Sequence, residues 1–360
     1  MHQSSSNDGY WSNVFSNPLL MESIVKRLSF LDIHRLRKVC RGARECMEII
    51  KPDPQIYSVF IKRMNLDQFD VEFNLKYGFL RVSYISDDSE CFVSSGEKTT
   101  KVSSNFLETL ISDMASILKH QKAALKGIKF EMSLKVLSNQ ICFSNEEPPD
   151  LIRNEFFDAF KQTFFSEKTW IPVERVTIET SDQQDVLDVL SSLNPAHLRD
   201  VELWSAYQRY EKTHIDLEEV SNLKQWKKAK RLLAKRNLII DTPVQKLNLS
   251  HFRDIKICVD SISPEEILNL KQICLESRAF KRFIFELKNP VSESSLHNSL
   301  GAPIIREDDS SQKKEWVFRT SSSSEMIFSI DYLPEKISFY NLPWSMFGQF
   351  YVNVDIPVID

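Results

Sequence analysis

The stretch from Asn17 to Arg44, NPLLMESIVKRLSFLDIHRLRKVCRGAR, decides the fold of the first part of this chain. Apolar residues recur in it at helical spacing on both sides of a Ser-Phe interruption. They are Leu20, Ile24 and Leu28, then Leu31, Ile33, Leu36, Val39 and Cys40. Pro18 suits the first turn of a helix. The pattern predicts two or three short helices, and a segment this short cannot bury all of its apolar surface alone.

Five landmarks in this stretch stand in a recognisable order: a proline near the start, an isoleucine six residues on, an R-L-S break, an aspartate, and a leucine leading into V-C-R. The stretch resembles an F-box. The resemblance implies that residues 17–50 dock onto the Skp adaptor of a cullin-RING ubiquitin ligase. The adaptor contacts implied are Pro18, Leu19, Leu20, Ile24, Leu28, Leu31, Ile33, Leu36, Val39 and Cys40.

Two positions depart from the F-box pattern. Asn17 stands where a leucine is usual, and Ala43 stands where a tryptophan is common, next to the helix-weakening Gly42. These departures bear on the affinity for the adaptor. The alternative explanation of the whole stretch is an ordinary helical hairpin that belongs to a larger core.

The composition excludes several classes of protein. The 360 residues leave room for a small docking module plus one large or two moderate domains. The net charge of −4, with both signs abundant, does not indicate a general nucleic-acid binder. Neither a Walker motif, nor G-x-G-x-x-G, nor C-x-x-C appears, so we expect no cofactor and no metal. No stretch is typical of a membrane span or a secretory leader, which predicts an intracellular protein, cytoplasmic and/or nuclear.

The sequence outside the F-box-like stretch divides into four segments that differ in their residue patterns. Residues 1–16 are expected to form a flexible lead, residues 51–102 a connecting strand-rich segment, residues 103–333 alternating strands and helices, and residues 334–360 a C-terminal cap or tail. The tract after Leu287 through Lys314 is polar and predicts a loop. Closing strands are expected at 316–319, 326–330 and 336–340.

A weak repeat with the spacing L-x-x-L-x-L occurs at least five times after residue 124. Its triplets are Leu125, Ile128, Phe130; Val173, Val176, Ile178; Leu198, Val201, Leu203; Phe252, Ile255, Ile257; and Phe280, Phe283, Phe285, with Ala229, Leu232, Ala234 as a poorer sixth. The predicted fold is therefore α/β: a short three-helix F-box followed by a leucine-rich-repeat-like arc of alternating strands and helices. The alternative is one ordinary α/β domain with coincidental spacing.

Three strings in this region carry a second resemblance. They are LRDVELW at 198–204, NLKQWKKAKRL at 222–232, and HFRDIKICVDSISPEEILNLKQICLESRAFKRFIFEL at 251–287. They are similar to the FTH domain that accompanies F-boxes in a large nematode family, the F-box A family. The resemblance implies a protein-interaction domain and carries over no catalytic residue.

The remaining candidates concern binding and catalysis. Cys258 with His251, or Cys40 with His34, could suggest a thiol nucleophile, but odd spacing on one strand puts the first pair on opposite faces. Residues 224–236 hold seven cations and no acid, which is typical of a solvated helix face, of a surface for an acidic protein, or of a nucleic-acid contact. The candidate target-binding residues are Trp204, Tyr207, Tyr210, Trp226, Lys227 and Lys228, although each aromatic could equally fill the core.

The leading hypothesis is a non-catalytic substrate receptor, in which the F-box holds the adaptor and the FTH-like region holds an unknown target protein. The alternative is an interaction or antagonist protein that works without the adaptor. A nucleic-acid partner is the least favoured hypothesis, and no membrane partner is expected.

Overall fold

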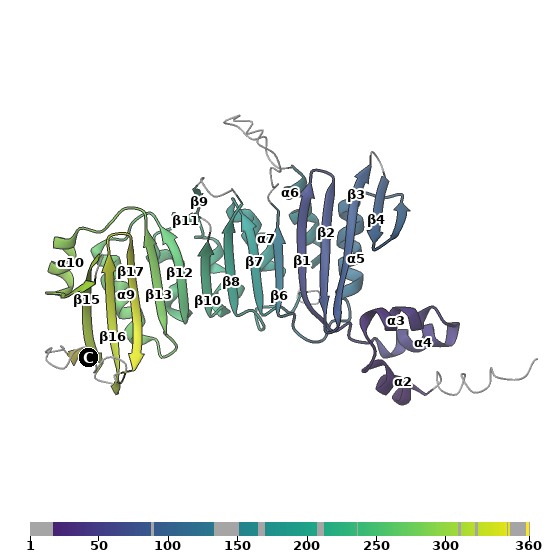
Figure 1. Cartoon of the computed structure of the whole chain (residues 1–360), viewed down its shortest axis with the longest axis horizontal. Coiled ribbons are helices and arrows are strands. Elements are labelled where there is room, and N and C mark those ends of the chain that lie inside the picture. Colours follow the sequence, from purple (N-terminus) through teal and green to yellow (C-terminus); the bar gives the residue numbers. More distant parts are fainter. Residues whose placement is uncertain are drawn as a thin grey trace, which may run out of the picture. The chain divides into compact units, whose positions relative to one another are not determined.

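The computed structural model describes residues 17–360 except 88–89, 133–150, 165–169, 207–211, 236, 309–310, 321–322, 344, 346–357 and 360. It divides into two compact units. Unit 1 lies within residues 1–129 and 134–173, and unit 2 lies within residues 130–133 and 174–360 (Figure 1). The expected lead at 1–16 lies outside the described residues. No helix in the described part of the chain is long and apolar enough to cross a membrane.

Unit 1 begins with three short helices, α2 (Pro18–Val25), α3 (Phe30–Arg37) and α4 (Arg41–Ile50). Ser29 starts α3, where its hydroxyl accepts from the amide of Asp32 at 3.2 Å. The Cys40 sulfur accepts from the amide of Ala43 at 3.4 Å and starts α4. Such caps satisfy amides that have no partner within the helix. The prediction of short helices in this stretch is confirmed.

An antiparallel meander follows the three helices and accounts for the strand-rich segment 51–102. Its strands are β1 (Ile56–Asn65), β2 (Gln68–Leu75), β3 (Gly78–Asp87), β4 (Glu90–Ser95) and β5 (Lys98–Val102). The helices α5 (Phe106–Leu118) and α6 (Leu151–Phe164) complete the unit, and β6 (Gly127–Glu131) lies between them in the chain. The ring of Phe156 on α6 stacks on Phe69 of β2 with centroids 5.4 Å apart, so aromatic packing joins helix to sheet.

Unit 2 is built on parallel strands. They are β7 (Arg175–Thr180), β8 (Asp200–Ser205), β10 (Arg231–Lys235), β12 (Asp254–Val259) and β13 (Arg282–Leu287), each paired with the next. The middle residues of the repeat fall in one row across the sheet, namely Val176, Val201, Leu232, Ile255 and Phe283. Every residue of the predicted triplets is buried, including the poorer sixth. Two further strands, β9 (Thr213–Ile215) and β11 (Leu238–Ile240), are too short for the sequence pattern to predict.

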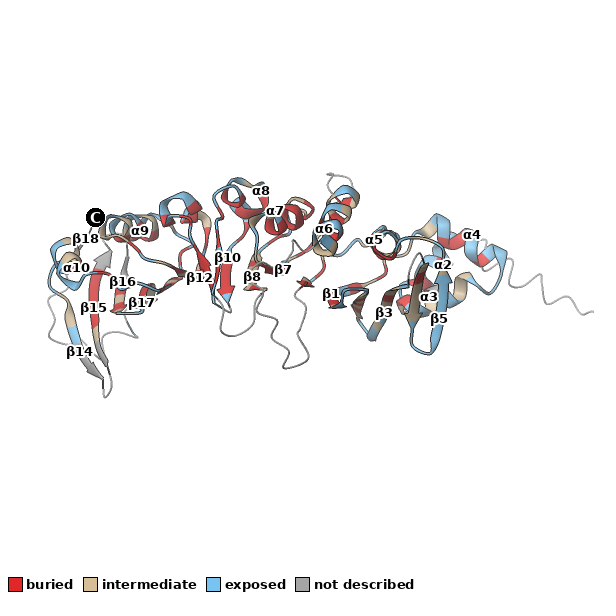
Figure 2. Cartoon of the chain, turned by 90° about the horizontal axis from the view of Figure 1, so that it is seen from above, coloured by how far each residue is buried: buried red, intermediate tan, exposed pale blue. Residues whose placement is uncertain are grey.

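The helices of unit 2 lie on the buried side of these strands, as Figure 2 shows for α7 (Gln183–Ser191), α8 (Lys224–Lys228) and α9 (Pro264–Glu276). Short 3₁₀ turns at η1 (Val220–Asn222), η2 (Val244–Leu247) and η3 (Leu249–His251) complete the connections. The start of α9 is a capping box, because Ser263 accepts from the Glu266 amide at 3.2 Å and Glu266 accepts from the Ser263 amide at 2.9 Å.

Antiparallel strands close unit 2. They are β14 (Ile304–Asp308), β15 (Ser311–Thr320), β16 (Ser323–Leu333) and β17 (Lys336–Pro343), with a short β18 (Val358–Ile359) beside β15. β17 pairs with β13, which confirms the expected closing strands. The prediction of a loop through Lys314 was wrong. That tract contains α10 (Glu293–Leu300) and β14. The only buried residue of α10 is Leu296, and one apolar position gives no periodicity from which a helix could be predicted.

Candidate adaptor-docking and target-binding surfaces

The three N-terminal helices hold a small core of their own. Met21 and Val25 of α2, Ile33 of α3, and Cys46 and Met47 of α4 are buried, and Leu28, Leu36 and Ile50 pack against them. Burial lowers the exposed fraction of Met21 to 1% and of Ile33 to 5%. Of the predicted adaptor contacts, Ile33, Leu28 and Leu36 thus serve mainly to hold the helices together. The core residues on α4 lie beyond the stretch on which the prediction rested.

The other predicted contacts lie on the surface of this helical core. Leu19 is 79% exposed and Val39 is 67% exposed, and Leu20, Ile24 and Leu31 are also exposed. Pro18 and Cys40 are exposed beside them in the chain. Ile49 is 71% exposed and was not predicted, because it lies off the apolar stripe of α4. Apolar side chains exposed on so small a folded core are typical of a binding surface.

The two departures from the F-box pattern have a local physical reason. The Asn17 side-chain oxygen accepts from the Leu20 amide at 3.2 Å and caps α2, which a leucine there could not do. Ala43 is completely buried, so close packing of α4 leaves no space for a larger ring at this position. Both residues support the fold of the three helices.

The open face of the unit 2 sheet, on the side away from α7, α8 and α9, carries alternating charges. Its first row across the strands is Arg175, Asp200, Arg231, Asp254 and Arg282. Arg175 pairs with Asp200 at 2.9 Å, and Arg282 pairs with Asp254 at 3.0 Å. Further along the strands, Lys256 pairs with Glu286 at 2.8 Å. Opposite charges side by side on neighbouring strands stabilise the sheet modestly.

Comparison with known protein families matches residues 17–52 to the F-box domain and residues 154–298 to the FTH domain. The chain carries an F-box domain followed by an FTH domain. No curated protein and no solved structure matched it. The F-box domain implies binding to a Skp-family adaptor within Skp-cullin-F-box complexes, and F-box proteins are typically non-catalytic subunits of these ligases.

The predicted target-binding residues of the FTH domain separate into different environments. Trp204 is half-buried on the open face, where Lys235 Nζ lies 5.5 Å from the centre of its ring. Lys227 and Lys228 are exposed. Tyr207 and Tyr210 lie outside the described residues. An anchoring role for Trp204 and the two lysines stays a prediction.

Trp226 requires a correction, because it is a core residue and has no surface to offer a partner. It is completely buried, its indole N–H donates to the Leu247 carbonyl at 2.8 Å, and its ring meets Phe252 edge to face with centroids 5.3 Å apart. Burial also removes Trp226 as a platform for stacking nucleic-acid bases. The surrounding lysines on α8 remain solvent-exposed.

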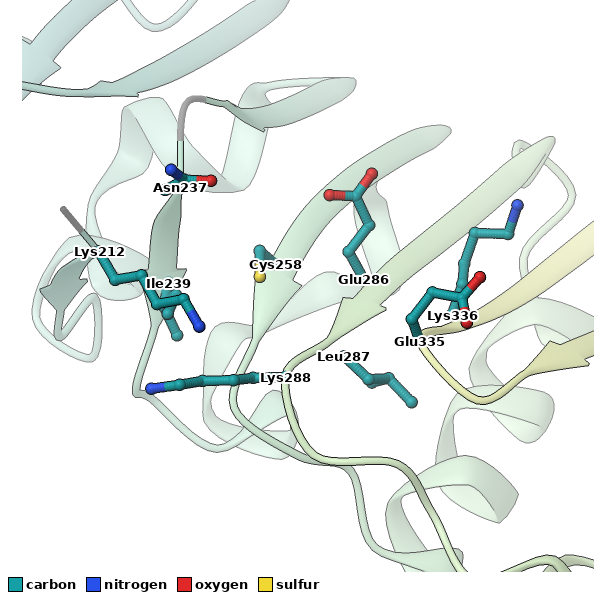
Figure 3. A pocket seen from close by; sticks show the side chains of 9 residues that line it. All are labelled: Lys212, Asn237, Ile239, Cys258, Glu286, Leu287, Lys288, Glu335 and Lys336. Carbon is teal, nitrogen blue, oxygen red and sulfur yellow. The ribbon is translucent and has the colours of Figure 1, made fainter. Parts of the chain in front are cut away.

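Of the pairs considered for catalysis, His251 and Cys258 lie on different elements. The sequence suggested that His251 lies on the same strand as Cys258, but it lies in η3, before β12 begins. Its Nε2 donates to the Trp226 carbonyl at 2.7 Å. Cys258 lies near the far end of β12, lining a hollow of about 330 Å³ with Lys212, Glu286 and Lys288 (Figure 3). Burial raises the pKa of the Cys258 thiol, which disfavours a thiolate nucleophile. Within the described ranges no three His, Cys, Asp or Glu side chains are placed to hold a metal ion.

Proposed function

We propose that this protein is the substrate-recognition subunit of a Skp-cullin-F-box ubiquitin ligase. The F-box docks onto the Skp-family adaptor, and the FTH domain binds the protein that is ubiquitylated. The order of the two domains supports this proposal. The observation that carries it is the set of exposed apolar side chains on the F-box core, led by Leu19 and Val39.

In this proposal the exposed predicted contacts touch the adaptor directly. They are Pro18, Leu19, Leu20, Ile24, Leu31, Val39 and Cys40. Covering apolar surface contributes about 25 cal/mol for each Å² removed from water, so a few such side chains are enough for a specific contact. Leu28, Ile33 and Leu36 act indirectly, because they fix the helices that carry the contact residues.

The proposed role needs no reacting side chain on this chain. A receptor that holds its target beside the charged conjugate of the ligase accelerates transfer by raising the effective concentration of the target's lysines. We further propose that the parallel-stranded part of residues 103–333, from β7 to β13, forms degenerate leucine-rich-repeat-like units in an arc. The shared row of buried residues from Val176 to Phe283 supports such a repeat.

Copurification of the full chain with a Skp-family adaptor tests the proposal. A Leu19→Asp variant places a charge in the proposed contact without touching the core, whereas Leu28→Asp would also damage the packing of the helices. The matched control is Leu66→Asp, which changes an exposed leucine in the turn between β1 and β2. We expect the wild type and Leu66→Asp to retain the adaptor and Leu19→Asp to lose it.

A wild-type chain that retains no adaptor would overturn the ligase proposal and favour the second candidate, an interaction or antagonist protein that works without the adaptor. The observation in favour of that candidate is Asn17, because a polar capping residue replaces the apolar side chain usual in the F-box. Binding of a target whose cellular level does not depend on this protein would support the second candidate.

A further inference from the structure

A repeated backbone pattern aligns four basic residues at the start of the parallel strands of the FTH domain. The carbonyl of Arg199 accepts from the amides of Lys230 and Arg231 at 2.6 and 3.0 Å. The carbonyl of Lys230 accepts in the same way from Arg253 and Asp254. The carbonyl of Arg253 accepts from Lys281 and Arg282 at 2.9 and 3.2 Å.

This pattern fixes the spacing of Arg199, Lys230, Arg253 and Lys281. They precede β8, β10, β12 and β13, which are neighbours in the sheet, so their backbones follow one another at the strand spacing of about 4.8 Å. All four side chains are exposed. Residues that are 23 to 31 positions apart in the sequence thus form one continuous row of positive charge.

The row lines an open hollow of about 930 Å³. Lys228 and Arg231 line the same hollow, and together these six residues are called the basic edge: Arg199, Lys228, Lys230, Arg231, Arg253 and Lys281. Pro195, Ala196, Leu198 and Ala279 supply an apolar part of the lining. The hollow therefore combines many cationic donors with an apolar surface.

The described chain offsets the positive charge of the basic edge only in part. The two acids that line the hollow, Asp200 and Asp254, flank Arg231 in the sheet. Their ion pairs are with Arg175 and Arg282, which do not belong to the basic edge. None of the six basic-edge residues forms an ion pair with another residue that the structure describes. The whole chain has a net charge of −4, so this concentration of cations is local.

Six cations against two carboxylates leave the hollow with an excess of positive charge, and the cations repel one another. A partner that brings negative charge relieves this repulsion, and an electropositive groove also accelerates the encounter with such a partner. The arrangement is thus better explained by binding than by stability.

We propose that the basic edge binds a carboxylate-rich, extended segment of a partner protein. The inference rests on the proposal that the FTH domain holds a target, and it adds the chemistry by which that target is recognised. Arginine and lysine donors match Asp and Glu carboxylates, and the apolar lining accommodates aliphatic side-chain stems. A nucleic acid fits less well, because the lining contains no aromatic side chain to stack a base.

The test uses the full chain and a fluorescein-labelled peptide rich in Glu and Asp, with fluorescence anisotropy as the readout. We expect salt-sensitive binding that the double variant Arg199→Glu/Arg253→Glu weakens by about tenfold or more. The matched control, Lys98→Glu/Lys122→Glu, makes the same change in net charge at exposed lysines of unit 1 and is expected to bind as the wild type does. Lys230→Glu/Lys281→Glu provides a second test if the first variant folds poorly.

Three results would overturn the inference. They are no binding of the peptide to the wild type, equal losses in the basic-edge and control variants, and tighter binding of a single-stranded oligonucleotide at the same residues. Adaptor copurification in parallel separates this inference from the ligase proposal. Peptide binding without adaptor retention refutes the ligase role alone, and adaptor retention without peptide binding refutes the acidic-partner inference alone.

Discussion

Arg282 and Asp254 join two neighbouring strands of the FTH domain at the border of the basic edge. One guanidinium nitrogen of Arg282 lies 3.0 Å from one carboxylate oxygen of Asp254 and 3.1 Å from the other. The pair stabilises the contact between β12 and β13 and, at the same time, keeps one negative charge in the hollow that Arg253 and Lys281 line. The Asp254 carboxylate therefore stabilises the domain but disfavours the binding of an acidic partner.

Replacing Asp254 by Asn should separate the effect of this residue on stability from its effect on binding. We expect the acidic peptide to bind several-fold more tightly, because the hollow loses a repelling carboxylate, while the free energy of unfolding falls by about 1 kcal/mol or less, since the pair is partly exposed. Anisotropy and urea denaturation measure the two effects. Glu286→Gln, which removes a carboxylate paired with Lys256 away from the hollow, is the control. Weaker peptide binding by the Asp254 variant would contradict the proposed location of the site.

The cap on α2 predicts a local effect in the F-box. Asn17→Ala removes the acceptor for the Leu20 amide and should destabilise α2 by about 1 kcal/mol. Hydrogen exchange of the α2 amides measures this local stability, and adaptor affinity should fall in parallel because α2 carries Leu19 and Leu20. Asn17→Asp retains a capping oxygen and should behave as the wild type. Unchanged exchange in the alanine variant would show that the cap does not hold the helix.

The burial of Trp226 predicts a large loss of stability. Trp226→Ala should lower the free energy of unfolding by about 3–5 kcal/mol, because it leaves a cavity beside Phe252 and removes the donor to the Leu247 carbonyl. Trp204→Ala, at a half-buried position, should cost clearly less. Urea denaturation of both variants checks the order. A larger effect at Trp204 would refute the assignment of Trp226 to the core.

The environment of His251 predicts a dependence of stability on pH. Burial lowers its pKa from the ordinary 6.5, and the positive charges of Lys230 and Lys227 act in the same direction. The folded protein therefore holds His251 neutral, whereas the unfolded chain takes up a proton below about pH 6.5. The stabilising contribution is present above that pH and is lost as the pH falls through the lowered pKa of the folded state.

Urea midpoints between about pH 7.5 and about pH 5.5 measure this effect. The wild type should lose stability toward the acidic end, and His251→Gln, which can still donate to the Trp226 carbonyl, should lose less over the same range. If the urea midpoint changed equally with pH in the two proteins, His251 would not titrate on unfolding. Substitution of His214, which pairs with Asp241 in an exposed site, serves as the comparison for the His251 variant.

Short-range patterns predicted a large part of this fold. The apolar spacing from Leu20 to Val39 indicated the short helices, and the triplets around Val176, Leu232 and Phe283 indicated the strands. These signals work because a helix or a strand places its own side chains at a fixed period, whatever lies around it. The tract that holds α10 was missed, since one buried leucine creates no period.

The sequence by itself determined which residues are apolar, which elements they form and where the basic residues fall beside each strand. Only the tertiary structure decided that Ile33 is core while Leu19 is exposed, that Trp226 is buried, and that Arg199 and Lys281 belong to one edge. The reason is physical. Periodicity within an element depends on the backbone of that element alone, whereas burial and long-range neighbours depend on which faces pack together and on the register of strands far apart in the chain.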